Sequence, residues 1–323
     1  MFLDNVILFS YLIISALCII LINLCAEKYK DSKSLSFFAK PAPFVMQFAF
    51  GGLFSSYIVF YSRSASFLNS WPFLLMLAVF FIGNEFFRRR YEKLNFHLSI
   101  FFIAVFSYSI FSLPVLINQV GPAIFFLSGM VSLLVTGGLL YLLKWFTPEY
   151  IAKNQNWILL TLGSIYVIFN ILYFTNIIPP LPLSLKEVGV YHNVIRTEEN
   201  TYVLFGEKKP WYHFFKKSRF HFQRGFPAYN YGVVFAPANI KLEIYHSWSY
   251  FDEEKKSWVE VSRISYPVSG GRDEGYRGYT IKENIWPGEW RVDIMTKHGQ
   301  IIGQNSFKAI AVDITPRLEA KTK

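Results

Sequence analysis

The first 180 residues alternate between long apolar stretches and short polar segments. Six stretches carry almost no charge and are long enough, at about 1.5 Å per helical residue, to cross a hydrocarbon core of about 30 Å. They span residues 6–26, 44–62, 71–87, 98–117, 122–143 and 157–178. The pattern predicts an α-helical membrane domain of six transmembrane helices in residues 1–178.

The pattern changes at a run of prolines after the sixth stretch. Pro179, Pro180 and Pro182 end the helix, because proline lacks an amide donor and restricts the residue before it. Hydrophobic side chains then recur at every second position in residues 240–250 and 290–294, which is typical of strands that bury one face. The sequence thus predicts an exit linker at 179–187, an all-β, antiparallel, sandwich-like domain of immunoglobulin-like shape at 188–312, and a polar tail at 313–323. A closed barrel is the structural alternative.

Turn residues divide this β region into strands. Residues 252–257 form a charged hairpin tip, and His298-Gly299 separates two further apolar runs. Trp290 lies on the apolar face of the most regular alternating run. We therefore expect Trp290 to anchor the core of the β domain.

Composition supports an integral membrane protein, since 53% of the residues are hydrophobic and the mean hydropathy is +0.29. Residues 1–180 hold 11 Lys and Arg against 6 Asp and Glu, and residues 181–323 hold 21 against 16, a net +5 in each part. This even excess gives no dedicated basic arm for nucleic acid. Cys18 and Cys25 are too few for a disulfide framework or a metal site.

Basic residues in the loops predict the orientation, because Lys and Arg accumulate on the cytoplasmic side. Alternate loops hold ten basic residues and the other loops hold Arg63 alone; the ten are Lys28, Lys30, Lys33, Lys40, Arg88, Arg89, Arg90, Lys93, Lys144 and Lys153. The N-terminus and the β domain are therefore expected outside the cytoplasm. In a Gram-negative cell this means a multi-pass inner-membrane protein with a periplasmic domain.

Glu85 is the one clear ionisable residue inside the apolar stretches. Asn84 and Glu85 are the candidate intramembrane polar site, since an ionisable group at membrane depth is costly. Arg88 and Arg89 follow Glu85 at helical spacing, so an interfacial salt bridge is the simpler interpretation. The paired glycines Gly51-Gly52 and Gly137-Gly138 are expected to allow close helix packing.

The β domain offers one candidate ligand-binding surface. Arg272 and Arg277 bracket a glycine-rich loop, Tyr276 and Tyr279 lie beside them, and Arg263 precedes them on a neighbouring strand. Converging guanidinium groups suit an acidic glycan or an anionic lipid. The rival interpretation is that neighbouring carboxylates pair with these arginines.

Other chemistry finds little support in the sequence. The histidines are too scattered for a zinc pattern, and we expect no metal and no cofactor. The soluble part contains neither a nucleophile elbow nor a cysteine nucleophile. His246, which lies on the same strand face as Trp248, is expected to be a packed core residue.

Four segments carry a resemblance: IPPLPLSLKEVGVYH at 178–192, IYHSW at 244–248, GGRDEGYRGYT at 270–280 and GEWRVDI at 288–294. They resemble a bacterial membrane-protein family that is known only as a domain of unknown function. The resemblance implies a multi-helix region followed by a small β domain, and implies no reaction or catalytic residue.

The sequence therefore favours a binding or scaffold protein of the cell envelope over an enzyme. The expected partners are the lipid bilayer and a glycan, lipid headgroup or envelope protein, with nucleic acid disfavoured by the topology. The alternative is a membrane enzyme or transporter that acts on an envelope lipid or glycolipid.

Overall fold

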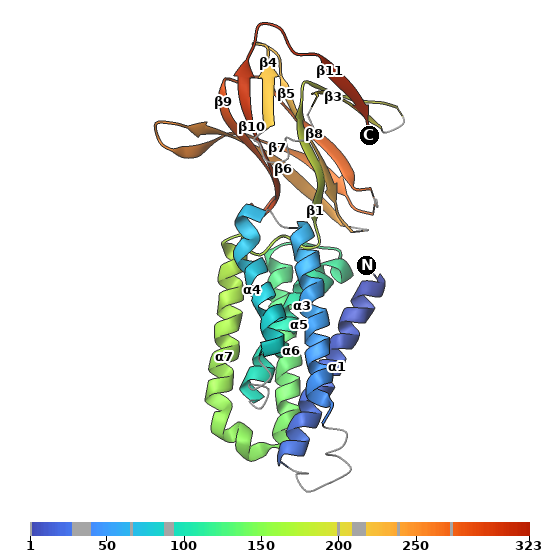
Figure 1. The fold of residues 1–323 in the computed structure, drawn as a ribbon, viewed down its shortest axis with the longest axis vertical. Coiled ribbons are helices and arrows are strands. Elements are labelled where there is room, and N and C mark those ends of the chain that lie inside the picture. Colours follow the sequence, from blue (N-terminus) through green and yellow to red (C-terminus); the bar gives the residue numbers. More distant parts are fainter. Residues whose placement is uncertain are drawn as a thin grey trace. The chain divides into compact units, whose positions relative to one another are not determined.

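The computed structural model describes residues 2–27, 40–64, 67–86, 94–198, 201–208, 218–237, 240–271 and 274–323. The chain forms two compact units that join in sequence at Leu181 and Pro182 (Figure 1). The first unit is helical and the second is built of β-strands. We describe each unit by itself.

In its described residues, the first unit has six helices. They are α1 (Phe2–Glu27), α3 (Ala42–Ser64), α4 (Phe67–Phe86), α5 (Leu94–Ile117), α6 (Pro122–Phe146) and α7 (Pro148–Phe174). The six predicted helices are thus confirmed. Within the described residues, five are long and apolar enough to cross a membrane, whereas the apolar part of α4, Ser70–Gly83, is shorter.

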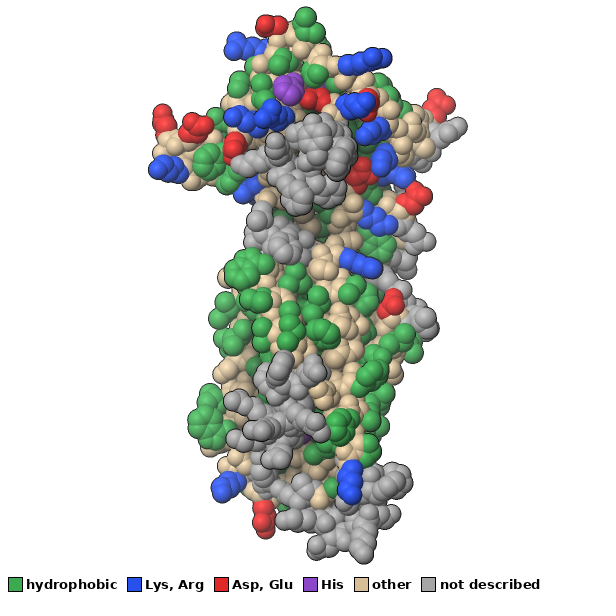
Figure 2. Space-filling view, viewed as in Figure 1, with side chains coloured by type: hydrophobic (Ala, Val, Ile, Leu, Met, Phe, Trp, Pro, Cys, Tyr) green, Lys and Arg blue, Asp and Glu red, His purple; other side chains and the backbone are tan. Residues whose placement is uncertain are grey.

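Helix α5 lies at the centre of the helical unit. Its sequence is apolar on every side, and 72% of its most apolar window is buried. A helix without a polar face is stable where neighbours cover it, and α1, α6 and α7 all contact α5. The other helices expose large hydrophobic side chains, which Figure 2 shows spread over the visible face of this unit, while charged side chains gather on the β unit.

The last helix departs from the prediction at both ends. The loop expected at 144–156 is reduced to Thr147, because Pro148 begins α7 at the first helical position, where a missing amide donor costs nothing. Lys153 therefore lies within the helix. The helix ends at Phe174, before the prolines, and the chain turns at Asn176, which has a φ of 58°.

Small residues bring α6 against its neighbours. Ser128 Oγ donates to the carbonyl oxygen of Ser109 on α5 over 3.1 Å, and a Cβ added at Gly129 would lie 2.6 Å from the ring of Tyr166 on α7. The predicted packing role fails at Gly137 and Gly138, which have no atom within 4 Å of the position of a Cβ. These two glycines lie on a face of α6 that no described helix covers.

The described part of the β unit contains eleven strands. They are β1 (Ser184–Tyr191), β2 (Asn193–Arg196), β3 (Tyr202–Glu207), β4 (Ser218–Phe222), β5 (Ala228–Phe235), β6 (Lys241–Asp252), β7 (Ser257–Ser269), β8 (Tyr276–Lys282), β9 (Gly288–Thr296), β10 (Ile301–Ala311) and β11 (Leu318–Thr322). They make three sheets, in the orders β1-β5-β8, β4-β10-β9-β6-β7 and β11-β3-β2. The described sheets have open edges, so they do not form the closed barrel that the sequence left as an alternative.

Strand β5 is the central strand of the unit because both of its faces are buried. Val234 packs with Ile244 and Ile294 of the five-stranded sheet, and on the opposite face Val233 packs with Leu204 of the third sheet. A strand between two layers needs apolar side chains at successive positions rather than at alternate ones. The result is a layered core in which the β1-β5-β8 sheet is covered on both sides.

Several predicted features of the β region are confirmed. Strands β6 and β7 pair antiparallel across the hairpin tip after Asp252, and a turn with Gly299 at a φ of 80° joins β9 and β10. Trp248 and Trp290 are fully buried. Both belong to one core cluster with Phe220 and Phe307, so the period-two pattern identified the buried face correctly.

Two features differ from a purely antiparallel two-sheet sandwich. Strand β4 pairs parallel with β10, since Phe220 lies opposite Ala309 in a parallel register. There are three sheets, and the third includes β11, which falls in the segment expected to be a polar tail and pairs with β3. Pairing between strands distant in sequence produced both differences, and local periodicity carries no signal for it.

Candidate functional site

The predicted arginine surface is divided between two sheets. Arg263 lies on β7 and its guanidinium Nη2 is 2.8 Å from Glu260 Oε2, while Arg277 lies on β8 with its Nη2 2.6 Å from Glu274 Oε2. Arg263 and Arg277 thus each have a carboxylate partner three residues away. Arg272 lies outside the described residues.

The two tyrosines of this surface pack in different places. Tyr276 packs against the core between the β1-β5-β8 sheet and the five-stranded sheet, whereas Tyr279 packs with Tyr202 and Tyr229 on the opposite side of its strand. Alternation along β8 puts Arg277 on the same face as Tyr279 and opposite to Tyr276. The structure therefore brings Arg277 and Tyr279 onto one face and separates them from Tyr276.

The candidate intramembrane pair falls at the end of a helix. Asn84 and Glu85 belong to the last turn of α4, which ends at Phe86. Their side chains lie outside the described part of the chain, as do Arg88 and Arg89.

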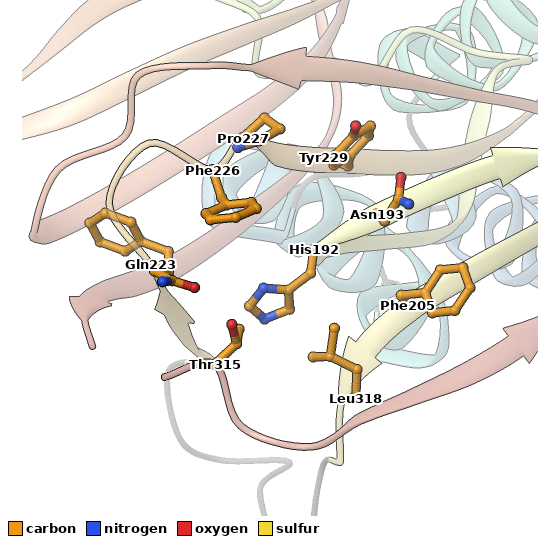
Figure 3. A pocket seen from close by; sticks show the side chains of 10 residues that line it. His192, Asn193, Phe205, Gln223, Phe226, Pro227, Tyr229, Thr315 and Leu318 are labelled. Atoms are coloured by element: carbon orange, nitrogen blue, oxygen red, sulfur yellow. The ribbon is translucent and has the colours of Figure 1, made fainter. Parts of the chain in front are cut away.

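A cleft of about 370 Å³ opens in the β unit where distant stretches of chain converge. Its walls come from the β1–β2 junction, β3, the β4–β5 connection and the segment before β11 (Figure 3). Six lining residues are apolar or aromatic (Phe205, Phe222, Phe226, Pro227, Tyr229 and Leu318), and four are polar (His192, Asn193, Gln223 and Thr315). Pockets of this kind, with many aromatic groups and few polar ones, are typical of ligand sites.

A tight turn presents Phe226 at the edge of the cleft. The Phe226 amide donates to the Gln223 carbonyl over 3.2 Å, and Gly225 has a φ of 85°, which fits a type II turn with glycine at its third position. The Phe226 side chain is 60% exposed. Phe226 therefore adds an exposed aromatic ring to the lining of the cleft.

The His192 side chain is held in the cleft by Glu207. His192 Nε2 lies 3.2 Å from Glu207 Oε1, and the same carboxylate accepts hydrogen bonds from the His221 amide and from His221 Nδ1, each over 2.7 Å. We call His192, Glu207 and His221 the Glu207 cluster. It links the β1–β2 junction, β3 and β4, and therefore connects all three sheets.

The charge state of the Glu207 cluster follows from these contacts. Partial burial raises the pKa of Glu207, but the hydrogen bonds from His192 and His221 outweigh burial and hold this pKa below its ordinary value. Glu207 is therefore ionised at neutral pH. Within the described ranges, no three His, Cys, Asp or Glu side chains are arranged to hold a metal ion.

Sequence reasoning did not identify this site. Glu207 lies 15 residues from His192 and 14 from His221, so no short motif contains the cluster. The one local signal is Gln223-Arg224-Gly225-Phe226, in which a glycine between polar and aromatic residues predicts a turn. The folded sheets bring the three side chains together.

A second histidine, His246, lies fully buried between the sheets. Its Nδ1 is 2.9 Å from Thr280 Oγ1 and 3.3 Å from Asn230 Nδ2, and its Nε2 is 3.2 Å from the Tyr266 hydroxyl. Burial lowers the pKa of His246 to about 3, so the ring is neutral. His246 is the packed core residue that the sequence predicts, with both ring nitrogens hydrogen-bonded.

Part of the β unit matches a protein family of unknown function. Residues 241–309, from β6 to β10, match DUF2914, described as a protein of unknown function, and no curated protein matches the chain. Among solved structures, one similar chain is the Pseudomonas fluorescens alkylpurine DNA glycosylase AlkC bound to DNA containing an abasic site analog. It has 12% identity and a TM-score of 0.27 over 82% of this chain and 77% of that chain.

Proposed function

We propose that this protein is a multi-pass inner-membrane protein whose β unit binds a component of the cell envelope. The observation that carries the proposal is the cleft beside His192, where aromatic rings and polar side chains meet and Phe226 is exposed. A glycan, a lipid headgroup or a protein partner is the class of ligand. The five apolar helices that are long enough to cross a membrane support the role of a membrane anchor.

The cleft supports binding better than the arginine surface does. Arg263 and Arg277 already pair with carboxylates, and such exposed pairs contribute about 0–1 kcal/mol each. In the cleft, by contrast, the Phe226 ring is 60% exposed. An envelope component is therefore expected in the cleft.

Capture from membranes tests the proposal. The tagged full-length protein is purified from membranes, and the co-purifying glycans, lipids and proteins are identified. Phe226→Ser should lose a component that the wild type retains. Val259→Ser, which changes a 39% exposed residue on β7, should retain it. Identical profiles for all three proteins would contradict the proposal.

The proposed topology places the N-terminus and the β unit outside the cytoplasm. It is supported by the sequence, in which ten basic residues lie between or beside the apolar stretches on one side and one, Arg63, on the other. A phosphatase fused after Lys323 should be active, and a fluorescent protein fused there should stay dark. An inactive phosphatase fusion together with a fluorescent second fusion would show that the orientation is the opposite one.

A further inference from the structure

The lining of the cleft favours an uncharged ligand. None of its ten described lining residues is Lys, Arg, Asp or Glu. A charged group that entered would lose its hydration without gaining an opposite charge, which is costly. An acidic glycan and an anionic lipid headgroup are thus poor ligands for this cleft.

The same lining matches a sugar ring. A pyranose presents flat C–H faces and places its hydroxyl groups around the edge, so it needs both aromatic surfaces and hydrogen-bonding side chains. The cleft supplies aromatic rings from Phe205, Phe226 and Tyr229, with amide groups from Asn193 and Gln223. A hydrocarbon chain would leave these amides without partners, which costs free energy.

The contact with Glu207 determines the hydrogen-bonding role of His192. An ionised carboxylate can only accept hydrogen bonds, so His192 donates to it through Nε2–H over 3.2 Å. A ring that carries its proton on Nε2 has a hydrogen-bond acceptor at the other nitrogen, Nδ1. Figure 3 shows the His192 ring among the lining side chains, between Gln223 on one side and Phe205 on the other.

We infer that the cleft binds a neutral carbohydrate and that His192 Nδ1 accepts a hydrogen bond from a hydroxyl or amide group of the sugar. Glu207 is the positioning residue, because it selects the tautomer and orientation of His192. The inference rests on the proposed function and adds to it the class of ligand and the specificity-determining side chain.

His221 completes the arrangement from β4. Its amide and its Nδ1 both donate to Glu207, which leaves the carboxylate with three hydrogen bonds in one orientation. His192 is also fixed by its backbone, since its amide donates to the Phe205 carbonyl over 2.9 Å. The ring and the backbone of His192 are therefore both held in place before a ligand binds, which lowers the cost of binding.

The test uses the full-length protein in nanodiscs of neutral lipid. Calorimetry measures binding of glucose oligomers, N-acetylglucosamine oligomers and an oligouronic acid. We expect at least one neutral oligomer to bind and the acidic oligomer to bind more weakly. His192→Phe, which keeps an aromatic ring and removes the acceptor, should weaken neutral binding about tenfold.

Three further variants separate positioning from general stability. Glu207→Ala should weaken binding as much as His192→Phe, and Glu207→Gln, whose amide oxygen can still accept from His192, should recover part of the loss. Glu319→Ala, which removes a carboxylate from the exposed pair with Lys208 on the same sheet, should bind like the wild type. Melting curves report whether each variant is folded.

Nitrogen NMR of ¹⁵N-histidine-labelled protein gives a readout that a purely structural role would not change. His192 should carry its proton on Nε2 in the wild type and lose this preference in Glu207→Ala. In Glu207→Gln the amide NH₂ group should face His221 Nδ1 and move that proton to Nε2. A His192 protonated on Nδ1 in the wild type would overturn the assignment.

Failure of this inference can be told from failure of the proposed function. If membrane capture depends on Phe226 but no neutral oligomer binds, the site holds a lipid or protein and the carbohydrate inference is wrong. If folded Glu207→Ala binds like the wild type, Glu207 has no positioning role. If capture does not depend on Phe226, the proposed function itself fails.

Discussion

His246 shows how one buried side chain makes the stability of the β unit depend on pH. The folded protein holds the ring neutral, with a pKa of about 3, whereas an unfolded chain returns it to about 6.5. Between these values the unfolded state binds a proton that the folded state does not. The contribution of His246 therefore lowers the free energy of unfolding as the pH falls from 6.5 toward 3 and is constant above 6.5.

Replacement of His246 by Gln should flatten this dependence. The wild type should lose up to about 1.4 kcal/mol per pH unit in the acidic range from this residue alone. Denaturant unfolding at a series of pH values measures the slope. His298→Gln, which changes an exposed turn residue, is the control. If the free energy of unfolding depends on pH equally in the wild type and in His246→Gln, other groups dominate the loss of stability at acidic pH.

Trp290 is a second buried residue, and its replacement should measurably lower the free energy of unfolding. It is fully buried, and its Nε1–H donates to the Trp286 carbonyl over 2.9 Å. Trp290→Ala should lower the free energy of unfolding by about 3–5 kcal/mol, because it leaves a large cavity. Trp286→Ala, at a side chain 37% exposed, should cost clearly less. Equal losses would mean that the two rings share the anchoring role.

At the scale of the elements, the helical unit depends on small residues where helices meet. A Cβ at Gly129 would lie 2.6 Å from Tyr166 on α7 and 3.1 Å from Phe106 on α5, while one at Gly137 would meet no atom within 4 Å. Both glycines lie on α6. They therefore form a matched pair in which only the packing differs.

Gly129→Val should lower the melting temperature of the purified full-length protein, since overpacking costs about 1–3 kcal/mol. Gly137→Val has the same intrinsic effect on helix propensity and should change the melting temperature much less. Fluorescence-detected size-exclusion after heating measures both variants in detergent. A larger loss for Gly137→Val would indicate a contact on that face with a neighbour outside the chain.

At the scale of the whole molecule, the β unit extends to the end of the chain. Leu318–Thr322 pair with β3, and Lys323 exchanges backbone hydrogen bonds of 2.9 Å with Tyr202. Leu318 also lines the cleft. The last residues therefore belong to the fold of the unit that holds the candidate site.

Residues 182–323 expressed alone should unfold cooperatively with a β-type circular dichroism spectrum, since their size suits one domain. Removal of residues 313–323 should lower the melting temperature by roughly 5–10 °C, corresponding to about 2–3 kcal/mol. Arg317→Ala, an exposed residue before β11, is the control. A truncated unit as stable as the longer one would show that β11 adds little.

The local pattern of the sequence determined the two-part architecture. Six apolar stretches predicted six helices, and alternation around His246, Trp248 and Trp290 predicted which strand faces are buried. These features follow from periods of about 3.6 and 2 residues, which a chain displays without reference to distant segments.

Only the tertiary structure decided the site. His192 comes from the β1–β2 junction, Glu207 from β3 and His221 from β4, and the parallel pairing of β4 with β10 positions the strand that carries His221. The predicted arginines lay close in sequence, yet sheet assignment separated Arg263 from Arg277. Strand pairing between distant segments depends on the whole core rather than on neighbours in sequence, so the cleft could be recognised only once the three sheets were assembled.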